Sequence, residues 1–137
     1  MHFFGDQLSH RQATARVNLI MVHPNTNIRL NILLAETFYK RLKGWTGFRP
    51  IPVNTWLWLT PCSSIHTMTM RESLSLVYLD PSNRICEIVP EIKPGRFHTC
   101  RRAASVLEAA CIEPTLLRKV IPYLEMEVQQ MLRTQTH

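Results

Sequence analysis

The stretch PCSSIHTMTM carries the side chains of this sequence that are best suited to chemistry. Cys62, His66 and Met70 offer a thiol, an imidazole and a thioether, and such a set suits copper(I) better than magnesium or calcium. A later connection carries Cys100 and His98, either of which could join the same site through the fold. One hypothesis is therefore a metal site built from Cys62, His66 and Cys100.

The spacing of these residues weighs against a single metal ion. The β-branched residues of the stretch favour an extended chain, in which side chains four positions apart lie ~13 Å from one another. Cys62, His66 and Met70 then line one face without reaching a common ion. Structural zinc sites also use paired close spacings, which the stretch lacks. Because methionine and cysteine readily fill apolar gaps, packing in a core or a pocket, with no cofactor, is the alternative.

Cys62 and His66 also offer the nucleophile and the base of a cysteine hydrolase or transferase. Such an enzyme needs a third, orienting group, which Glu108 or Asp80 could supply only through the fold. The sequence has no phosphate-binding loop, no dinucleotide fingerprint and no glycine-flanked nucleophile turn. We therefore expect a non-enzymatic protein and keep an enzyme that uses Cys62 and His66 as an alternative.

Most of the elements that must position these side chains are predicted to be strands. In TWLWL, Trp56 and Trp58 share one face and the two leucines share the other, so both faces are apolar and the strand is central. Proline and asparagine between two apolar runs predict a hairpin turn. The expected strands are residues 16–22, 28–35, 55–59, 74–79 and 84–89, with the hairpin turn at 80–83.

Helices are predicted near the middle and at the end of the chain. Residues 36–44 read as a short helix that ends at a C-terminal glycine. Residues 103–110 suit a helix by propensity, although the segment around Val106 also suits a strand. Pro114 fits the first turn of a helix that runs to residue 121, and a second helical segment follows Pro122.

The length of 137 residues fits one domain with a core of its own. We predict an N-terminal arm over residues 1–27, followed by a single compact domain over residues 28–137. The N-terminus is not typical of a signal peptide, because its positive charges come late and its apolar run is short. No stretch reaches the ~20 apolar residues of a membrane span, so we expect a cytoplasmic protein.

The net charge of +6 is scattered rather than concentrated in one run. We therefore do not favour a nucleic-acid partner, although such a charge is compatible with one. A third hypothesis is an interaction protein that binds a protein or nucleic-acid partner through basic loops or through the helical tail, Tyr123 to Arg133. The four cysteines form no CxxC pair and are read as reduced thiols.

The order of several short motifs resembles the bacterial and archaeal family called domain of unknown function 192. Its branch with a Pro-Cys-x-Ser-Ile-His-Thr segment is the most similar. The matching segments are Ala35 to Thr37, Arg41 to Gly44, Pro61 to Thr67 with Met70, Leu74 to Asp80, and Ala103 to Glu108. The resemblance implies a compact, mainly β fold with a small barrel-like sheet and short helices at its edge. It implies no activity, and relatives of this family are often exported.

The chain departs from the family pattern at three places. Ser73-Leu74-Ser75 stands where the family has Pro-Leu-Asp, so a recurrent carboxylate is replaced at Ser75. Trp45 replaces a leucine after Gly44, and residues 109–130 contain no glycine and read as more helical than the family. If a family function requires the aspartate, this chain has lost or changed that function.

These patterns together predict a mainly β (α+β) fold. It has a small barrel-like antiparallel or mixed sheet, short peripheral helices and a helical C-terminal segment. The leading functional hypothesis is a non-enzymatic binding or accessory domain. Its pocket is placed near His66, Met70, Arg71 and Glu108, because polar and soft groups there share a face beside an otherwise apolar strand.

Overall fold

The computed structural model describes residues 17–18, 30–35, 44–46, 50–52 and 54–135. They form a six-stranded mixed sheet in the order β1-β2-β3-β8-β5-β6, a separate two-stranded ribbon β4-β7, and the helix α3. The elements are β1 Val17–Asn18, β2 Asn31–Ala35, β3 Thr55–Leu59, β4 Ser64–His66, β5 Leu74–Leu79, β6 Ile85–Ile92, β7 Phe97–Thr99, β8 Ser105–Ala110 and α3 Pro114–Gln135.

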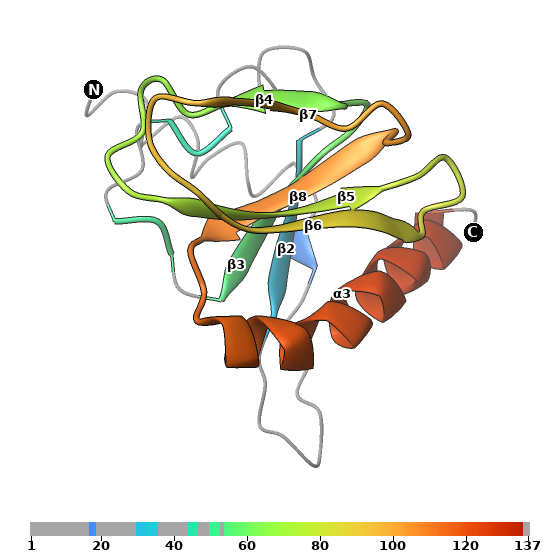
Figure 1. Cartoon of the computed structure of the whole chain (residues 1–137). Coiled ribbons are helices and arrows are strands. Elements are labelled where there is room, and N and C mark those ends of the chain that lie inside the picture. Colours follow the sequence, from blue (N-terminus) through green and yellow to red (C-terminus); the bar gives the residue numbers. More distant parts are fainter. Residues whose placement is uncertain (1–16, 19–29, 36–43, 47–49, 53, 136–137) are drawn as a thin grey trace.

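The sheet is the middle layer between two different structural layers (Figure 1). Helix α3 packs on one face, and the ribbon β4-β7 lies over the other. Each face has its own apolar cluster, because side chains alternate between the faces along each strand. Trp56 and Trp58 of β3 belong to the helix-side cluster, and Leu57 and Leu59 belong to the ribbon-side cluster. This confirms the sequence prediction of a central strand that is apolar on both faces.

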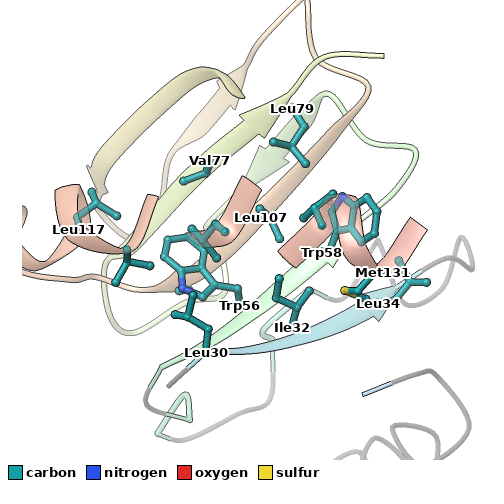
Figure 2. Packing of buried hydrophobic residues seen from close by; sticks show 14 residues of the cluster. Leu30, Ile32, Leu34, Trp56, Trp58, Val77, Leu79, Leu107, Leu117 and Met131 are labelled. Atoms are coloured by element: carbon teal, nitrogen blue, oxygen red, sulfur yellow. The ribbon is translucent and has the colours of Figure 1, made fainter. Parts of the chain in front are cut away.

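The helix-side cluster joins the sheet to α3. Trp56, Val77 and Leu107 of the sheet belong to this cluster together with Leu117 and Met131 of α3. In Figure 2, Met131 lies beside Leu34, and Leu117 lies at the other end of the cluster. The helix contributes a stripe at spacings of three and four residues, as expected of an amphipathic helix on a sheet. The buried residues of this stripe are Leu117, Val120, Leu124, Val128 and Met131.

The C-terminal helix corrects one sequence prediction. Two helical segments were expected on either side of Pro122, but α3 is a single helix of 22 residues with this proline inside it. Proline inside a helix costs about 3 kcal/mol because it lacks an N–H and crowds the preceding turn. Burial of the stripe on both sides of Pro122 offsets that cost, since each buried leucine or valine contributes about 2 kcal/mol.

The one strand pairing that was predicted is confirmed. Strands β5 and β6 form the predicted antiparallel hairpin, and Asn83 in its turn has a φ of 62°. Residues 105–110 form β8, which lies between β3 and β5. The helix alternative for this segment was therefore wrong. Pairing on both sides and burial on both faces override the helical propensity of its alanines, since strand preference depends on context.

The fold is mainly β, as predicted, but the sheet is not closed into a barrel. Among the described strands, β1 and β6 are the two ends of the hydrogen-bonded order. Helix α3 packs on one face of this sheet, and the ribbon β4-β7 lies over the other. Strand β1 falls within the predicted arm and pairs with β2, while the arm boundary at residues 27 and 28 stays a prediction.

The predicted helix over residues 36–44 lies outside the described residues except for Gly44, which has a φ of 48°. No helix in the described part of the chain is long and apolar enough to cross a membrane.

Candidate functional site

Glu108 is a carboxylate enclosed by apolar side chains. It lies on β8 with its side chain on the ribbon side of the sheet, between Leu57 of β3 and Leu76 of β5. Only 4% of its surface is exposed. Burial raises the pKa of Glu108 to about 7, and a backbone hydrogen bond from Trp45 opposes that rise. A carboxyl group with such a pKa changes charge near neutral pH.

The turn at Gly44 to Thr46 contacts Glu108 through a hydrogen bond and a close approach of its backbone. The indole Nε1 of Trp45 donates a hydrogen bond of 2.7 Å to the backbone oxygen of Glu108. A Cβ atom at Gly44 would lie 2.5 Å from the Oε1 atom of Glu108, so the backbone of the turn approaches the carboxylate closely. The hydroxyl of Thr46 lies 3.0 Å from that of Thr69 after β4. Two motifs that lie 63 positions apart in the chain therefore meet at one buried carboxylate.

A second polar cluster joins the ribbon to the sheet. The hydroxyl of Tyr78 on β5 lies 3.0 Å from Nδ1 of His98 on β7, and the two rings stack with centroids 5.4 Å apart. Nε2 of His98 lies 3.2 Å from Oε2 of Glu87 on β6. Burial strongly raises the pKa of Tyr78, so its hydroxyl stays protonated, and it also donates to the backbone oxygen of His98 at 3.4 Å. These contacts connect β5 to β7 and β6 through the His98 side chain.

Replacing Tyr78 with phenylalanine is expected to lower the free energy of unfolding by about 1 kcal/mol, because one partly buried hydrogen bond is lost. Urea denaturation of the wild type and of Tyr78→Phe measures this loss. The same substitution in a His98→Ala background is the control, since the hydroxyl has lost the imidazole there and keeps only the backbone oxygen of residue 98, which lies 3.4 Å away in the wild type. An equal loss in both backgrounds would show that the contact with the imidazole contributes nothing.

The four residues of the predicted pocket have different surroundings. His66 is exposed on β4, with its ring centroid 6.0 Å from that of Phe97, and Arg71 is exposed beyond the end of β4. Met70 is partly buried against the ribbon-side cluster. Glu108 is buried beneath Trp45. The two exposed residues and the buried carboxylate therefore occupy different layers, and a common pocket stays a prediction.

The three residues of the predicted metal site are also differently placed. Cys62 packs against the ribbon-side cluster, and its thiol donates to the backbone oxygen of Ser64 at 3.1 Å. Cys100 is buried, and His66 is exposed on the outer face of the ribbon. Within the described segments, no group of three or more His, Cys, Asp or Glu side chains is arranged to hold a metal ion. The metal site therefore gains no support and stays a prediction.

Ser75 stands where the family resemblance implies an aspartate, and its hydroxyl makes two hydrogen bonds. Its hydroxyl donates to the backbone oxygen of Pro90 at 2.8 Å and accepts from the backbone nitrogen of Ile112 at 3.0 Å. A carboxylate could accept from Ile112 but could not donate to Pro90. Ser75 therefore joins β5, β6 and the segment before α3, and this structural role suits a hydroxyl.

Sequence reasoning gave no role to Phe97 or Cys86, and it named His98 only as a spare metal ligand. Phe97, His98 and Thr99 form β7, which pairs with β4 in register. The segment has only three residues between a glycine turn and Cys100, which is too short for a recognisable alternation. No local pattern could show that Cys86 approaches Cys100, because only the tertiary fold brings them together.

Comparisons with known proteins agree with this architecture. The sequence model of the family DUF192, described as uncharacterized ACR, matches residues 20–113. A protein of unknown function from Novosphingobium aromaticivorans has a similar structure at a TM-score of 0.53 and 15% identity, covering 71% of this chain and 84% of its own. A candidate transcription regulator from Sinorhizobium meliloti gives a TM-score of 0.55 at 17% identity, covering 61% and 70% respectively.

At these identities the two solved structures establish the fold alone. No curated protein matches the chain. The family model spans most of the sequence and includes both motifs that meet at Glu108. The chain therefore belongs to the DUF192 family, whose members are uncharacterised.

Proposed function

We propose that this chain is a non-enzymatic binding domain that contacts a protein partner with the outer face of the ribbon β4-β7. The observation that carries the proposal is the exposure of Phe97, which leaves 75% of its surface in solvent. An aromatic side chain held on a paired strand loses little further freedom when a partner covers it. Exposed aromatic residues of this kind often supply much of the affinity of an interface.

The surroundings of Phe97 extend its apolar surface. His66 lies opposite Phe97 in the register of the ribbon, and Met68 beyond the end of β4 is 56% exposed. The hydroxyls of Ser64 and Thr99 lie 2.9 Å apart on the same outer face. An exposed apolar group bordered by polar side chains is typical of an interaction site.

The charges beside this face favour an acidic partner. Lys93 and Arg96 precede β7, Arg101 and Arg102 follow it, and all four are exposed. The whole chain also carries a net charge of +6. Arginine pairs well with carboxylates through its planar guanidinium group. A protein segment that combines acidic residues with an apolar or aromatic side chain would match both features of the face.

The contacts of the residues proposed for catalysis support a binding role over an enzyme. The exposed imidazole of His66 contacts the Phe97 ring, and the Cys62 thiol donates to the Ser64 carbonyl. The pairing that nucleophilic catalysis requires is a nucleophile hydrogen-bonded to its base.

A protein partner is favoured over a nucleic acid. Proteins that bind single strands stack successive bases on several aromatic side chains and follow the phosphates with a basic groove. Within the described residues, Phe97 is the one exposed large aromatic side chain, and its apolar neighbour is a methionine. The likeness to a candidate transcription regulator concerns the fold and does not change this preference.

Selection of a random peptide library on the wild-type chain tests the proposal. We expect enriched peptides to combine acidic and apolar residues. Phe97→Ser should weaken their binding by about tenfold or more, a loss of at least about 1.4 kcal/mol. Fluorescence anisotropy of a labelled selected peptide measures both affinities, with a thymidine oligonucleotide as the nucleic-acid probe.

The matched control is Met126→Ser, because Met126 is 54% exposed on α3, away from the ribbon. Both substitutions are at exposed positions, so the free energy of unfolding should change by less than about 0.5 kcal/mol. Equal binding to wild type and Phe97→Ser would reject the ribbon face. Tighter, strongly salt-dependent binding of the oligonucleotide would replace a protein partner with a nucleic acid.

A further inference from the structure

Two cysteine thiols lie side by side where the ribbon meets the edge strand of the sheet. Cys86 is on β6 and Cys100 directly follows β7, and their Sγ atoms are 3.8 Å apart. The two residues are 14 positions apart in the chain, and both are thiols in this structure. An S–S bond is ~2.05 Å long, so the sulfurs need to approach by about 1.8 Å, which small side-chain rotations can supply.

From this juxtaposition we propose that Cys86 and Cys100 are a redox modification site, which a small disulfide of the glutathione type converts into an intramolecular disulfide. The backbone around both residues is already held. Arg102 donates from Nη2 to the backbone oxygen of Cys86 at 3.0 Å, and the backbone nitrogen of Cys100 donates to Ser63 at 2.9 Å. The new bond would connect the ribbon covalently to the sheet. This inference does not depend on the proposed binding function.

The reaction proceeds by two thiol–disulfide exchanges. The thiolate of Cys86, which is partly exposed, attacks the small disulfide, forms a mixed disulfide and releases one small thiolate. The Cys100 thiol then loses its proton and attacks the Cys86 sulfur, which releases the second small thiolate. Each released thiolate takes up one proton. Two protein thiols are thereby oxidised to one disulfide, and one small disulfide is reduced to two small thiols.

The surroundings of Cys86 set the speed of this reaction. Burial raises its pKa to about 11, the hydrogen bond with Cys100 and the nearby Asp80 add to the rise, and Arg102 opposes it. Because only the thiolate reacts, the initial rate should rise about tenfold per pH unit below that pKa. We therefore expect about a 100-fold increase in rate between pH 7 and pH 9.

Incubation of the full chain with oxidised glutathione tests the proposal. Trypsin places Cys86 in the peptide 85–96 and Cys100 in the peptide 97–101, so a disulfide joins two peptides that each contain one cysteine. Mass spectrometry should detect this cross-linked pair after oxidation and lose it after treatment with dithiothreitol. The midpoint of thermal unfolding should rise by about 5–10 °C on oxidation, because the bond restricts the unfolded chain.

Four variants provide the controls. Cys86→Ser and Cys100→Ala should abolish both the cross-link and the thermal shift, while Cys62→Ser and Cys111→Ser should retain them. Cys86→Ser changes a partly exposed side chain, so it tests the pair even if the buried Cys100→Ala variant is unstable. Oxidation that yields only glutathione adducts, even at pH 9, would overturn the proposal. Cross-links that join Cys62 or Cys111 as often as the proposed pair would overturn it too.

Discussion

Replacing Gly44 with alanine is expected to lower the free energy of unfolding by about 3 kcal/mol. Gly44 has a φ of 48°, in the left-handed region, where a residue with a Cβ costs about 1–2 kcal/mol. The added Cβ would also lie 2.5 Å from the Oε1 atom of Glu108. Because Glu108 is enclosed by packed side chains, its carboxylate must shift within the core, and such overpacking costs about 1–3 kcal/mol. Urea denaturation at constant pH measures the change.

Gly95→Ala is the matched control for this prediction. Gly95 also has a positive φ, of 77°, but a Cβ built there meets no atom within 4 Å. Its substitution should therefore show the backbone cost alone, about 1 kcal/mol. In a Glu108→Ala background, Gly44→Ala should cost only as much as Gly95→Ala. If Gly44→Ala costs no more than Gly95→Ala in the wild type, the contact with the carboxylate does not constrain the turn.

Replacing Glu108 with glutamine is expected to stabilise the protein above pH 7 by about 3 kcal/mol. Burial raises the carboxyl pKa from 4.5 to about 7. Between pH 4.5 and about 7, the carboxyl group is therefore mostly protonated in the folded state and mostly ionised in the unfolded state. Each pH unit of that window removes about 1.4 kcal/mol of stability from the wild type. Glutamine stays neutral, and its oxygen can still accept the hydrogen bond from Trp45.

The sign of the effect makes the prediction specific. Since the folded-state pKa is raised, the wild type should lose stability as the pH rises from about 4.5 to 7 and then remain at the lower level. The stability difference between Glu108→Gln and wild type should be near zero at pH 4.5 and largest above pH 7. Urea denaturation midpoints across this range, at constant ionic strength, measure the difference.

Glu127 on α3 provides the control for this experiment. It is also buried, and burial raises its pKa, so it contributes to the same pH dependence. Glu127→Gln and the double variant separate the two contributions, because Glu108 faces the ribbon side of the sheet and Glu127 lies on the helix that packs on the other face, so the two substitutions should act additively. A pH-independent difference between Glu108→Gln and wild type would mean that Glu108 does not titrate in this window.

Several elements could be read from the sequence because their signals are local. The run 74–79 forms β5 with the predicted bounds, and the turn after it has Asn83 in the left-handed conformation. The segment TWLWL is likewise predictable from its own residues, since a strand with apolar residues on both faces must be buried on both faces. These predictions held because the pattern lies within a few residues and no distant contact opposes it.

Other elements were decided by contacts that no local pattern contains. Residues 105–110 combine helix-favouring alanines with the β-branched Val106, and pairing with β3 and β5 makes them a strand. Pro122 signals a helix end, yet α3 continues because apolar side chains on both sides of it pack against the sheet. The barrel was inferred from family resemblance, whereas β1 and β6 are the two ends of the hydrogen-bonded order among the described strands.

The candidate site divides in the same way. Residue types alone indicated that the side chains of Cys62, His66, Cys100 and Glu108 could bind a ligand or take part in a reaction. Family motifs indicated that Gly44 and Glu108 belonged to one fold. The tertiary structure decided that Gly44 meets Glu108, that His66 lies beside exposed Phe97, and that Cys100 lies beside Cys86. The physical reason is that periodicity determines which face a side chain occupies. Which residues share that face depends on the strand pairings and on the covering layers, which the chain reaches only when folded.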